Sequence, residues 1–198
     1  YYDQFKTTGF GANIKLGLIY RPKEYIRLGL AVHTPTWMSL RDKRTTDFTT
    51  IVESDTGRID SYTEHSTSYT NGEPGVSRYF QSSSWKAILS ASYVFREVQD
   101  TRKQRAFISA DIEYINHRAS RFSSDNEEPT ENELAYFKTL NKVVKQEFKG
   151  TFNFKLGGEV KFNTFMTRLG VAYYGSPYKD KSLKGNYTLL SGGIGYRN

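Results

Sequence analysis

The chain has 198 residues, a formal net charge of +7 and no Cys, which excludes disulfides and thiolate metal sites. Mean hydropathy is −0.64, and no apolar run reaches the 18 or more residues of a membrane-spanning helix. Membrane-spanning strands are not excluded, because their apolar residues alternate with polar ones. The basic residues form no helical stripe and no nucleic-acid motif, so we expect no nucleic-acid partner.

Seven segments alternate apolar and polar residues with the period of two that half-exposed strands require. They are residues 10–20, 26–33, 85–95, 106–114, 152–162, 165–173 and 190–196. The charged residues inside them all fall on the polar parity: Lys15, Arg27, Lys86, Asp111, Glu113, Lys155, Glu159, Lys161 and Arg168. The pattern therefore predicts an all-β, antiparallel fold in which each strand has an apolar and a polar side.

Connections of alternating length favour a transmembrane β-barrel. Residues 21–24 and 163–164 are short turns and 96–104 is moderate, whereas 39–84 and 118–147 are long and 175–186 is intermediate. Short turns on one side and long extracellular loops on the other are typical of outer-membrane barrels. Aromatic residues at the strand ends predict two interfacial girdles, formed by Tyr20, Tyr25, Phe95, Phe162 and Phe165 near the short turns and by Trp37, Trp85, Tyr114 and Tyr173 opposite. A soluble β-sandwich or a lipocalin-like barrel also alternates and stays open as an alternative.

The long loops carry two local predictions. Residues 39–84 are polar, with a hairpin expected near 49–53 and a turn at 71–75. Residues 130–146 are predicted to form a helix, because Thr130 and Glu133 make a capping box ahead of an apolar stripe. That stripe is Leu134, Phe137, Leu140 (or Asn141) and Val144. The helix either packs over the barrel mouth or contributes its stripe to an apolar entry site.

No catalytic or metal-binding constellation stands out. His33, His65 and His117 match no metal-ligand spacing, and no Gly-x-Ser-x-Gly elbow occurs. We therefore expect no enzyme activity, no cofactor and no metal. The polar-parity charges either keep a lumen hydrated or present a patch to an anionic headgroup. The candidate lumen-facing residues of a ligand pathway are Arg27, His33, Glu113 and Arg168.

Several stretches resemble the FadL/TodX family of outer-membrane transporters for hydrophobic compounds, in its Bacteroidetes-like form. They are residues 9–22 (GFGANIKLGLIYRP), 26–36 (IRLGLAVHTPT), 156–160 (LGGEV), 168–178 (RLGVAYYGSPY) and 190–197 (LSGGIGYR). The resemblance implies a porin-like barrel of 14 strands with an N-terminal plug. It also implies passive, ligand-gated diffusion of long-chain fatty acids and other hydrophobic compounds across the outer membrane of a Gram-negative bacterium.

The sequence departs from that family pattern, because it shows about seven strands, no plug and no C-terminal strand. We therefore expect residues 1–198 to be an internal fragment of a single outer-membrane barrel domain. The expected partners are membrane lipid and a hydrophobic small molecule or fatty acid, with the full-length barrel monomeric. The alternatives are a structural or adhesive surface barrel, whose loops bind a partner, and a soluble lipocalin-like binder of apolar ligands.

Overall fold

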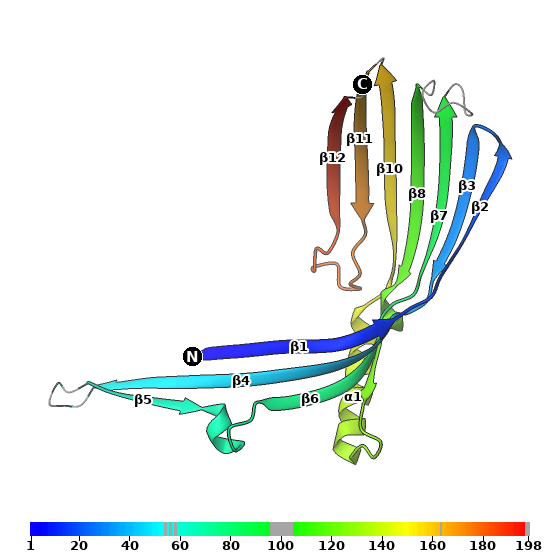
Figure 1. Cartoon of the computed structure of the whole chain (residues 1–198). Helices are drawn as coiled ribbons and strands as arrows, with labels where there is room; N and C mark the ends of the chain where they lie inside the picture. Colours follow the sequence, from blue (N-terminus) through cyan, green and yellow to red (C-terminus); the bar gives the residue numbers. More distant parts are fainter. Residues whose placement is uncertain (54, 56, 58, 96–104, 163, 197–198) are drawn as a thin grey trace. The chain divides into compact units, whose positions relative to one another are not determined.

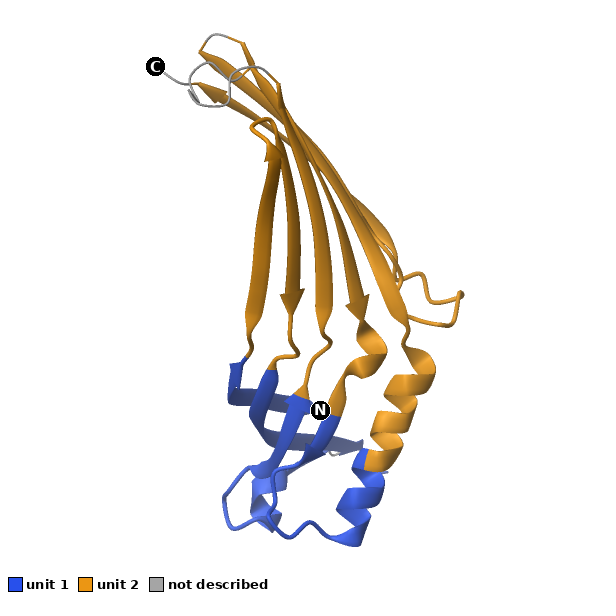
Figure 2. Ribbon diagram, turned by 90° about the vertical axis from the view of Figure 1, so that its right-hand side faces the viewer, with its two compact units in different colours: residues 1–12, 37–81, 122–137 blue, residues 13–36, 82–121, 138–198 orange. Residues whose placement is uncertain are grey.

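The computed structural model describes all residues except 54, 56, 58, 96–104, 163 and 197–198. It consists mostly of antiparallel β-structure with one α-helix, which confirms the predicted all-β class (Figure 1). The strands form one five-stranded and one seven-stranded sheet, and neither closes into a barrel. The chain divides into two compact units (Figure 2): residues 1–12, 37–81 and 122–137, and residues 13–36, 82–121 and 138–198.

The seven-stranded sheet belongs to the second unit and has the order β12-β11-β10-β8-β7-β3-β2. Its strands are β2 (Lys15–Lys23), β3 (Ile26–His33), β7 (Lys86–Phe95), β8 (Ala106–Asn116), β10 (Gly150–Phe162), β11 (Phe165–Tyr174) and β12 (Tyr187–Tyr196). Each neighbouring pair is antiparallel. The seven predicted segments each supply one of these strands. Phe162 lies opposite Phe165, which agrees with the predicted short turn; residue 163 and the predicted connection 96–104 lie outside the described residues.

The first predicted segment is wrong as a single strand. A strand β1 (Tyr2–Ala12), which the sequence pattern did not predict, ends before β2 begins at Lys15. Ile14 N donates a hydrogen bond to Thr34 Oγ1 at 3.0 Å, and Asn13 Nδ2 donates to Thr36 Oγ1 at 2.9 Å. The Thr34 hydroxyl thus replaces the backbone partner that a continuous ladder would give Ile14 N, and the Asn13 side chain makes a separate bond beside it. Two residues, Asn13 and Ile14, separate β1 from β2. Because this number is even, apolar residues keep the same parity on both sides of the gap. The alternation therefore does not show where one strand ends and the next begins.

The predicted long connection at residues 39–84 does lie between β3 and β7, but it is not a loop with a single hairpin. It holds most of β4 (Trp37–Glu53) and all of β5 (Ile59–His65), the short 3-10 helix η1 (Ser66–Tyr69) and β6 (Gly75–Ser82). These strands, β1 and β9 (Arg121–Ser124) form the five-stranded sheet, in the order β1-β4-β6-β9 with β5 paired to β4. Threonine and other β-branched residues favour these strands, but polar residues occupy both parities, so the two-residue period is missing.

Two local predictions in this region are confirmed. The hairpin expected near 49–53 is the pairing of β4 with β5, in which Thr49 lies opposite Thr63. The turn expected at 71–75 has positive φ at Asn71 (54°) and Gly72 (87°), a conformation that glycine and asparagine tolerate best. Gly72 N donates to Thr67 O at 2.8 Å and so links this turn to η1.

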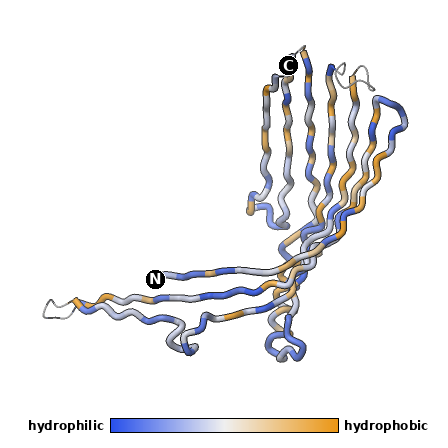
Figure 3. Tube along the Cα trace, in the orientation of Figure 1, coloured by the Kyte–Doolittle hydropathy of each residue, from blue (hydrophilic) through white to orange (hydrophobic). Residues whose placement is uncertain are grey.

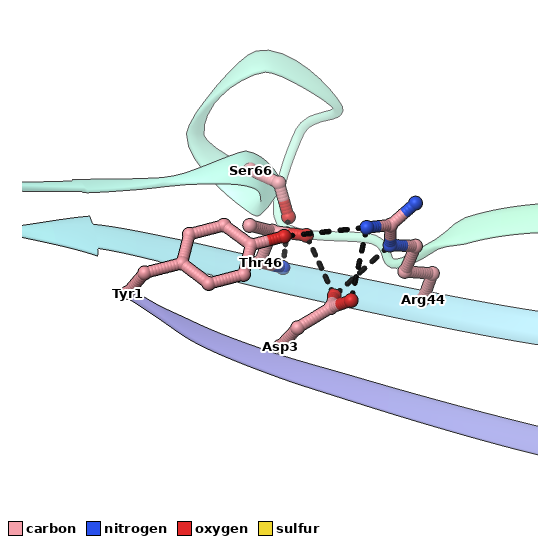
Figure 4. Close-up of polar contacts among 5 residues, drawn as sticks. All are labelled: Tyr1, Asp3, Arg44, Thr46 and Ser66. Carbon is pink, nitrogen blue, oxygen red and sulfur yellow. Dashed lines mark hydrogen bonds and ion pairs between the residues drawn. The ribbon is translucent and has the colours of Figure 1, made fainter.

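An exposed ion pair joins β1 to β4 in the first unit. Arg44 Nε and one terminal nitrogen each donate to a different carboxylate oxygen of Asp3 at 2.9 Å (Figure 4). The same guanidinium donates to Tyr1 Oη at 3.3 Å, and Thr46 Oγ1 donates to Asp3 at 2.9 Å. The hydrogen bonds from Arg44 and then Thr46 hold the pKa of the Asp3 carboxyl below its ordinary value. The cluster bridges the two strands near the start of β1, where Asp3 lies opposite Thr46.

The helix predicted at 130–146 is α1 (Glu131–Glu147). Glu133 N donates to Thr130 Oγ1 at 3.3 Å, and the Glu133 carboxylate accepts hydrogen bonds from the Ser124 hydroxyl and the Asn126 amide. These bonds, with one to the Thr130 backbone, lower the pKa of Glu133, and the capping box is confirmed. Val144 of the predicted apolar stripe is buried. No helix among the described residues is long and apolar enough to span a membrane.

Candidate functional site: the polar face of the seven-stranded sheet

The register of the seven-stranded sheet separates the two parities onto two faces. Glu113 lies opposite Asn153 and Glu159 lies opposite Arg168, whereas Ile112 lies opposite Phe154. The polar face carries all nine charged residues that the sequence placed on the polar parity: Lys15, Arg27, Lys86, Asp111, Glu113, Lys155, Glu159, Lys161 and Arg168. The other side, the apolar face, carries no charged residue from Leu16 to Tyr20 of β2 or in the other six strands. Figure 3 shows the resulting alternation along the strands.

Burial on the two faces is the reverse of that in a soluble protein. On the apolar face, Leu169 is 70% exposed and Leu190 is 77% exposed. On the polar face, Glu113 is 5% exposed, and Glu159 and Asn153 are each 4% exposed. Among the described residues, Val94 and Val144 are the only apolar side chains classed as buried. The described part of the chain thus shelters carboxylates and leaves most of its large apolar side chains uncovered.

Glu113 is the centre of one charged group on the polar face. Its Oε1 accepts a hydrogen bond from Asn153 Nδ2 at 2.8 Å, and its Oε2 accepts one from Lys86 Nζ at 3.2 Å. Lys155 Nζ lies 3.9 Å from the same carboxylate. Strands β7, β8 and β10 each contribute to the group, because these residues occupy neighbouring register positions. Two ammonium groups and one amide therefore compensate a sheltered carboxylate.

Glu159 is the centre of a second charged group, one strand further along. Arg168 Nε on β11 donates to Glu159 Oε2, and Lys161 Nζ lies 3.6 Å from the other carboxylate oxygen. The Arg168 side chain is 64% exposed, although its partner is buried. Arg168 therefore holds its carboxylate through Nε, and among the described residues its terminal nitrogens have no recorded hydrogen-bond partner.

A trough of small residues runs between these charged groups. Register places Arg27, Ser92, Ser109, Gly157, Gly170 and Ser191 side by side across six strands. Over one part of this small-residue row lies a hollow of about 460 Å³ bounded by Arg27 and Asp111, and over another lies a hollow of about 370 Å³ beside Arg168. Arg27 Nε is sheltered and has no hydrogen-bond partner among the described residues. Serine and glycine residues line the trough together with apolar side chains such as Leu28 and Leu30, and Arg27, Asp111 and Arg168 border it.

The four predicted pathway residues share the polar face but do not form one cluster. Arg27 lies at one end of the small-residue row, and Arg168 lies beside its other part. Glu113 accepts a hydrogen bond from Lys86, and Lys86 lies opposite His33 in the register. Lys86 therefore links the positions of Glu113 and His33. The sequence pattern did not identify Asn153 or the small-residue row as functional. The alternation of apolar and polar residues predicts on which face of the sheet these residues lie. Only the register between paired strands shows which of them are neighbours.

Among the described residues, no three His, Asp or Glu side chains are grouped so that they could hold a metal ion. The polar face instead offers charges held by counter-charges around an open trough, an arrangement suited to contact with a passing or bound solute. No protein-family model matches the chain, and no match was found among curated proteins or among solved structures.

Proposed function

We propose that this chain is part of a bacterial outer-membrane β-barrel through which hydrophobic compounds, such as long-chain fatty acids, diffuse passively. In this proposal the apolar face meets lipid and the polar face lines the interior. The reversed burial of the two faces carries the proposal, because an outer-membrane barrel puts apolar side chains outward and polar side chains inward. The membrane location and the transport activity rest on this pattern and on the family resemblance.

The amount of uncovered surface supports a nonaqueous partner. The chain exposes 14903 Å² for a mass of 22.8 kDa. A compact folded chain of this mass would expose roughly 9,600 Å², and two separate compact halves roughly 11,500 Å² together. Each large apolar side chain transferred from water into lipid would gain roughly 1.5–3 kcal/mol. Insertion would therefore supply the apolar burial that the described residues lack among themselves.

The polar face supports passage of an amphiphile. Small side chains leave room along the trough, while Arg27 and Arg168 offer guanidinium donors at two places along it. A guanidinium suits a fatty-acid carboxylate, because it forms paired, charge-assisted hydrogen bonds. We infer that the acid headgroup moves between these two donors while its chain follows the interior.

Uptake of a labelled fatty acid by cells that make the protein containing this chain tests the proposal. The test variant replaces Arg27, His33, Glu113 and Arg168 together by Ala, and we expect uptake to fall at least tenfold. The matched control replaces four exposed residues of the same types in the first unit, namely Arg41, His65, Glu64 and Arg78. We expect the control to keep its uptake, with equal amounts of both variants in the membrane.

Uptake that survives all four polar-face substitutions contradicts the pathway. A protein that enters the membrane but takes up no fatty acid even unaltered is instead a structural or adhesive surface barrel. A protein that stays monodisperse in water without detergent and binds the fatty acid there is a soluble lipocalin-like binder. Both of these outcomes contradict the proposed transport.

A further inference from the structure

Residues 175–186, which join β11 to β12, are fixed against the C-terminal end of α1. Lys149 N donates to Pro177 O at 2.9 Å, and Lys179 N donates to Glu147 O at 2.8 Å. Lys179 Nζ donates to Lys145 O at 2.7 Å, so an ammonium group meets the carbonyl end of the helix. The rings of Phe148 and Tyr178 lie against one another, with centroids 5.4 Å apart. The connection is therefore held in one place.

This junction concentrates positive charge. Residues 138–149 and 175–186 contain seven lysines and two acidic residues, a formal charge of +5. The lysines, which we call the lysine cluster, are Lys138, Lys142, Lys145, Lys149, Lys179, Lys181 and Lys184. Lys138, Lys142 and Lys145 follow helical spacing and share one face of α1, where all three are exposed. Lys181 and Lys184 are exposed on the connection.

The helix dipole explains only part of this arrangement. Lysines in the last turns of a helix stabilise its negative end, which accounts for Lys145 and for the bond from Lys179. Lys181 and Lys184 lie off the helix, and among the described residues no acidic side chain forms an ion pair with either of them. An external anion would account for them.

Aromatic residues mark the same end of the seven-stranded sheet. Lys149 directly precedes Gly150, the first residue of β10, which lies opposite Asn116 at the end of β8. Close by in the register, Trp85, Tyr114 and Phe152 form a ring cluster on the apolar face, with successive centroids 5.5 and 5.0 Å apart. An aromatic group followed by lysines beyond the strand ends matches the order of the bilayer interface and the lipid phosphates.

We propose that the lysine cluster binds the phosphate groups of anionic lipids at the membrane surface beside the strand ends. This inference rests on the proposed function, because it requires the apolar face to lie in a bilayer. Ammonium groups on flexible side chains suit phosphates presented in variable positions. The lysines lie on one face of α1 and on the connection that is hydrogen-bonded to its end. Because several ammonium groups are thus held near one another, they favour a lipid with more than one phosphate.

The test uses the protein that contains this chain, in lipid nanodiscs that hold equal amounts of phosphatidylcholine and lipid A. Native mass spectrometry counts the lipids that remain bound. We expect the unaltered chain to retain lipid A at least tenfold over phosphatidylcholine. A variant in which Lys142, Lys145, Lys181 and Lys184 become Gln should lose this preference, whereas the same four positions changed to Arg should keep it.

A control changes Lys6 and Lys43, the two lysines of the first unit, to Gln and should leave the preference unaltered. If the four-Gln variant retains as much lipid A as the unaltered protein, the proposal that the lysine cluster binds lipid phosphates is overturned. Binding of pyrophosphate to the lysine cluster without any preference for lipid A over phosphatidylcholine overturns the lipid assignment in favour of a free phosphate. If the protein that contains this chain enters no bilayer, the proposed function and this inference are both contradicted. If it inserts but shows no headgroup preference, only this inference is overturned.

Discussion

Asn153 on β10 donates a hydrogen bond from Nδ2 to Oε1 of Glu113 on β8 at 2.8 Å, and both side chains are almost fully sheltered. A carboxylate withdrawn from water requires partners for its charge and its lone pairs. Asn153 supplies an amide, while Lys86 and Lys155 supply the opposite charge. The pair therefore ties the two strands together on the face that we assign to the barrel interior.

Replacing Asn153 by Leu should destabilise the folded chain by about 1–3 kcal/mol, because Glu113 loses a buried hydrogen-bond donor. Urea titration of the chain folded in detergent micelles measures this change in unfolding free energy. The control, Asn186→Leu at an exposed loop position, should change it by less than about 0.5 kcal/mol. Equal losses in the two variants would show that the Glu113 contact contributes nothing specific.

Replacing Leu156 by Arg tests the environment of the apolar face. Leu156 lies opposite Ala110 and Val171 and is 47% exposed. If lipid covers it, the substitution should cost about 2–4 kcal/mol near the bilayer centre. If water covers it, the cost should stay within about 0.5 kcal/mol. Reversible unfolding from lipid vesicles measures the difference, and Lys155→Arg on the polar face is the control, expected to cost little.

The capping box of α1 should respond to acid. The pKa of Glu133 in the folded chain lies below its ordinary value of 4.5, because the carboxylate accepts hydrogen bonds from Ser124, Asn126 and the Thr130 backbone. Its stabilisation of the helix start is therefore complete above pH 4.5 and is lost as the pH falls through the lower, folded-state pKa. Amide NMR signals of residues 131–134, compared between the chain and Glu133→Gln, measure this loss. A difference between the two that persists unchanged to pH 2 contradicts it.

Alternation predicted the seven-stranded sheet because each strand has one uncharged side. Lys155 and Leu156 show the rule, since neighbouring residues of opposite character point to opposite faces. The pattern failed for β4, because threonines and other polar residues occupy both of its parities. It missed the end of β1 for a different reason, because the gap before β2 leaves the parity of the apolar residues unchanged.

Face assignment and pairing required different information. The sequence placed Glu113 and Lys86 on polar parities, but their contact depends on the register between β7 and β8. That register is determined by turns and by the packing of whole strands, which local spacing does not reveal. The small-residue row was missed for the same reason, because its members are far apart in the chain.

The assignment of the apolar face to lipid is tested most directly by a cysteine scan of β3, since the chain has no native Cys. Single cysteines at positions 26–33 carry a nitroxide in lipid bilayers, and its collision rates with oxygen and with a water-soluble nickel chelate are measured. We predict that oxygen dominates at Leu28, Leu30 and Val32, and the nickel chelate at Arg27, Gly29 and Ala31. Nickel dominance at both parities, or the opposite phase, would contradict the assignment.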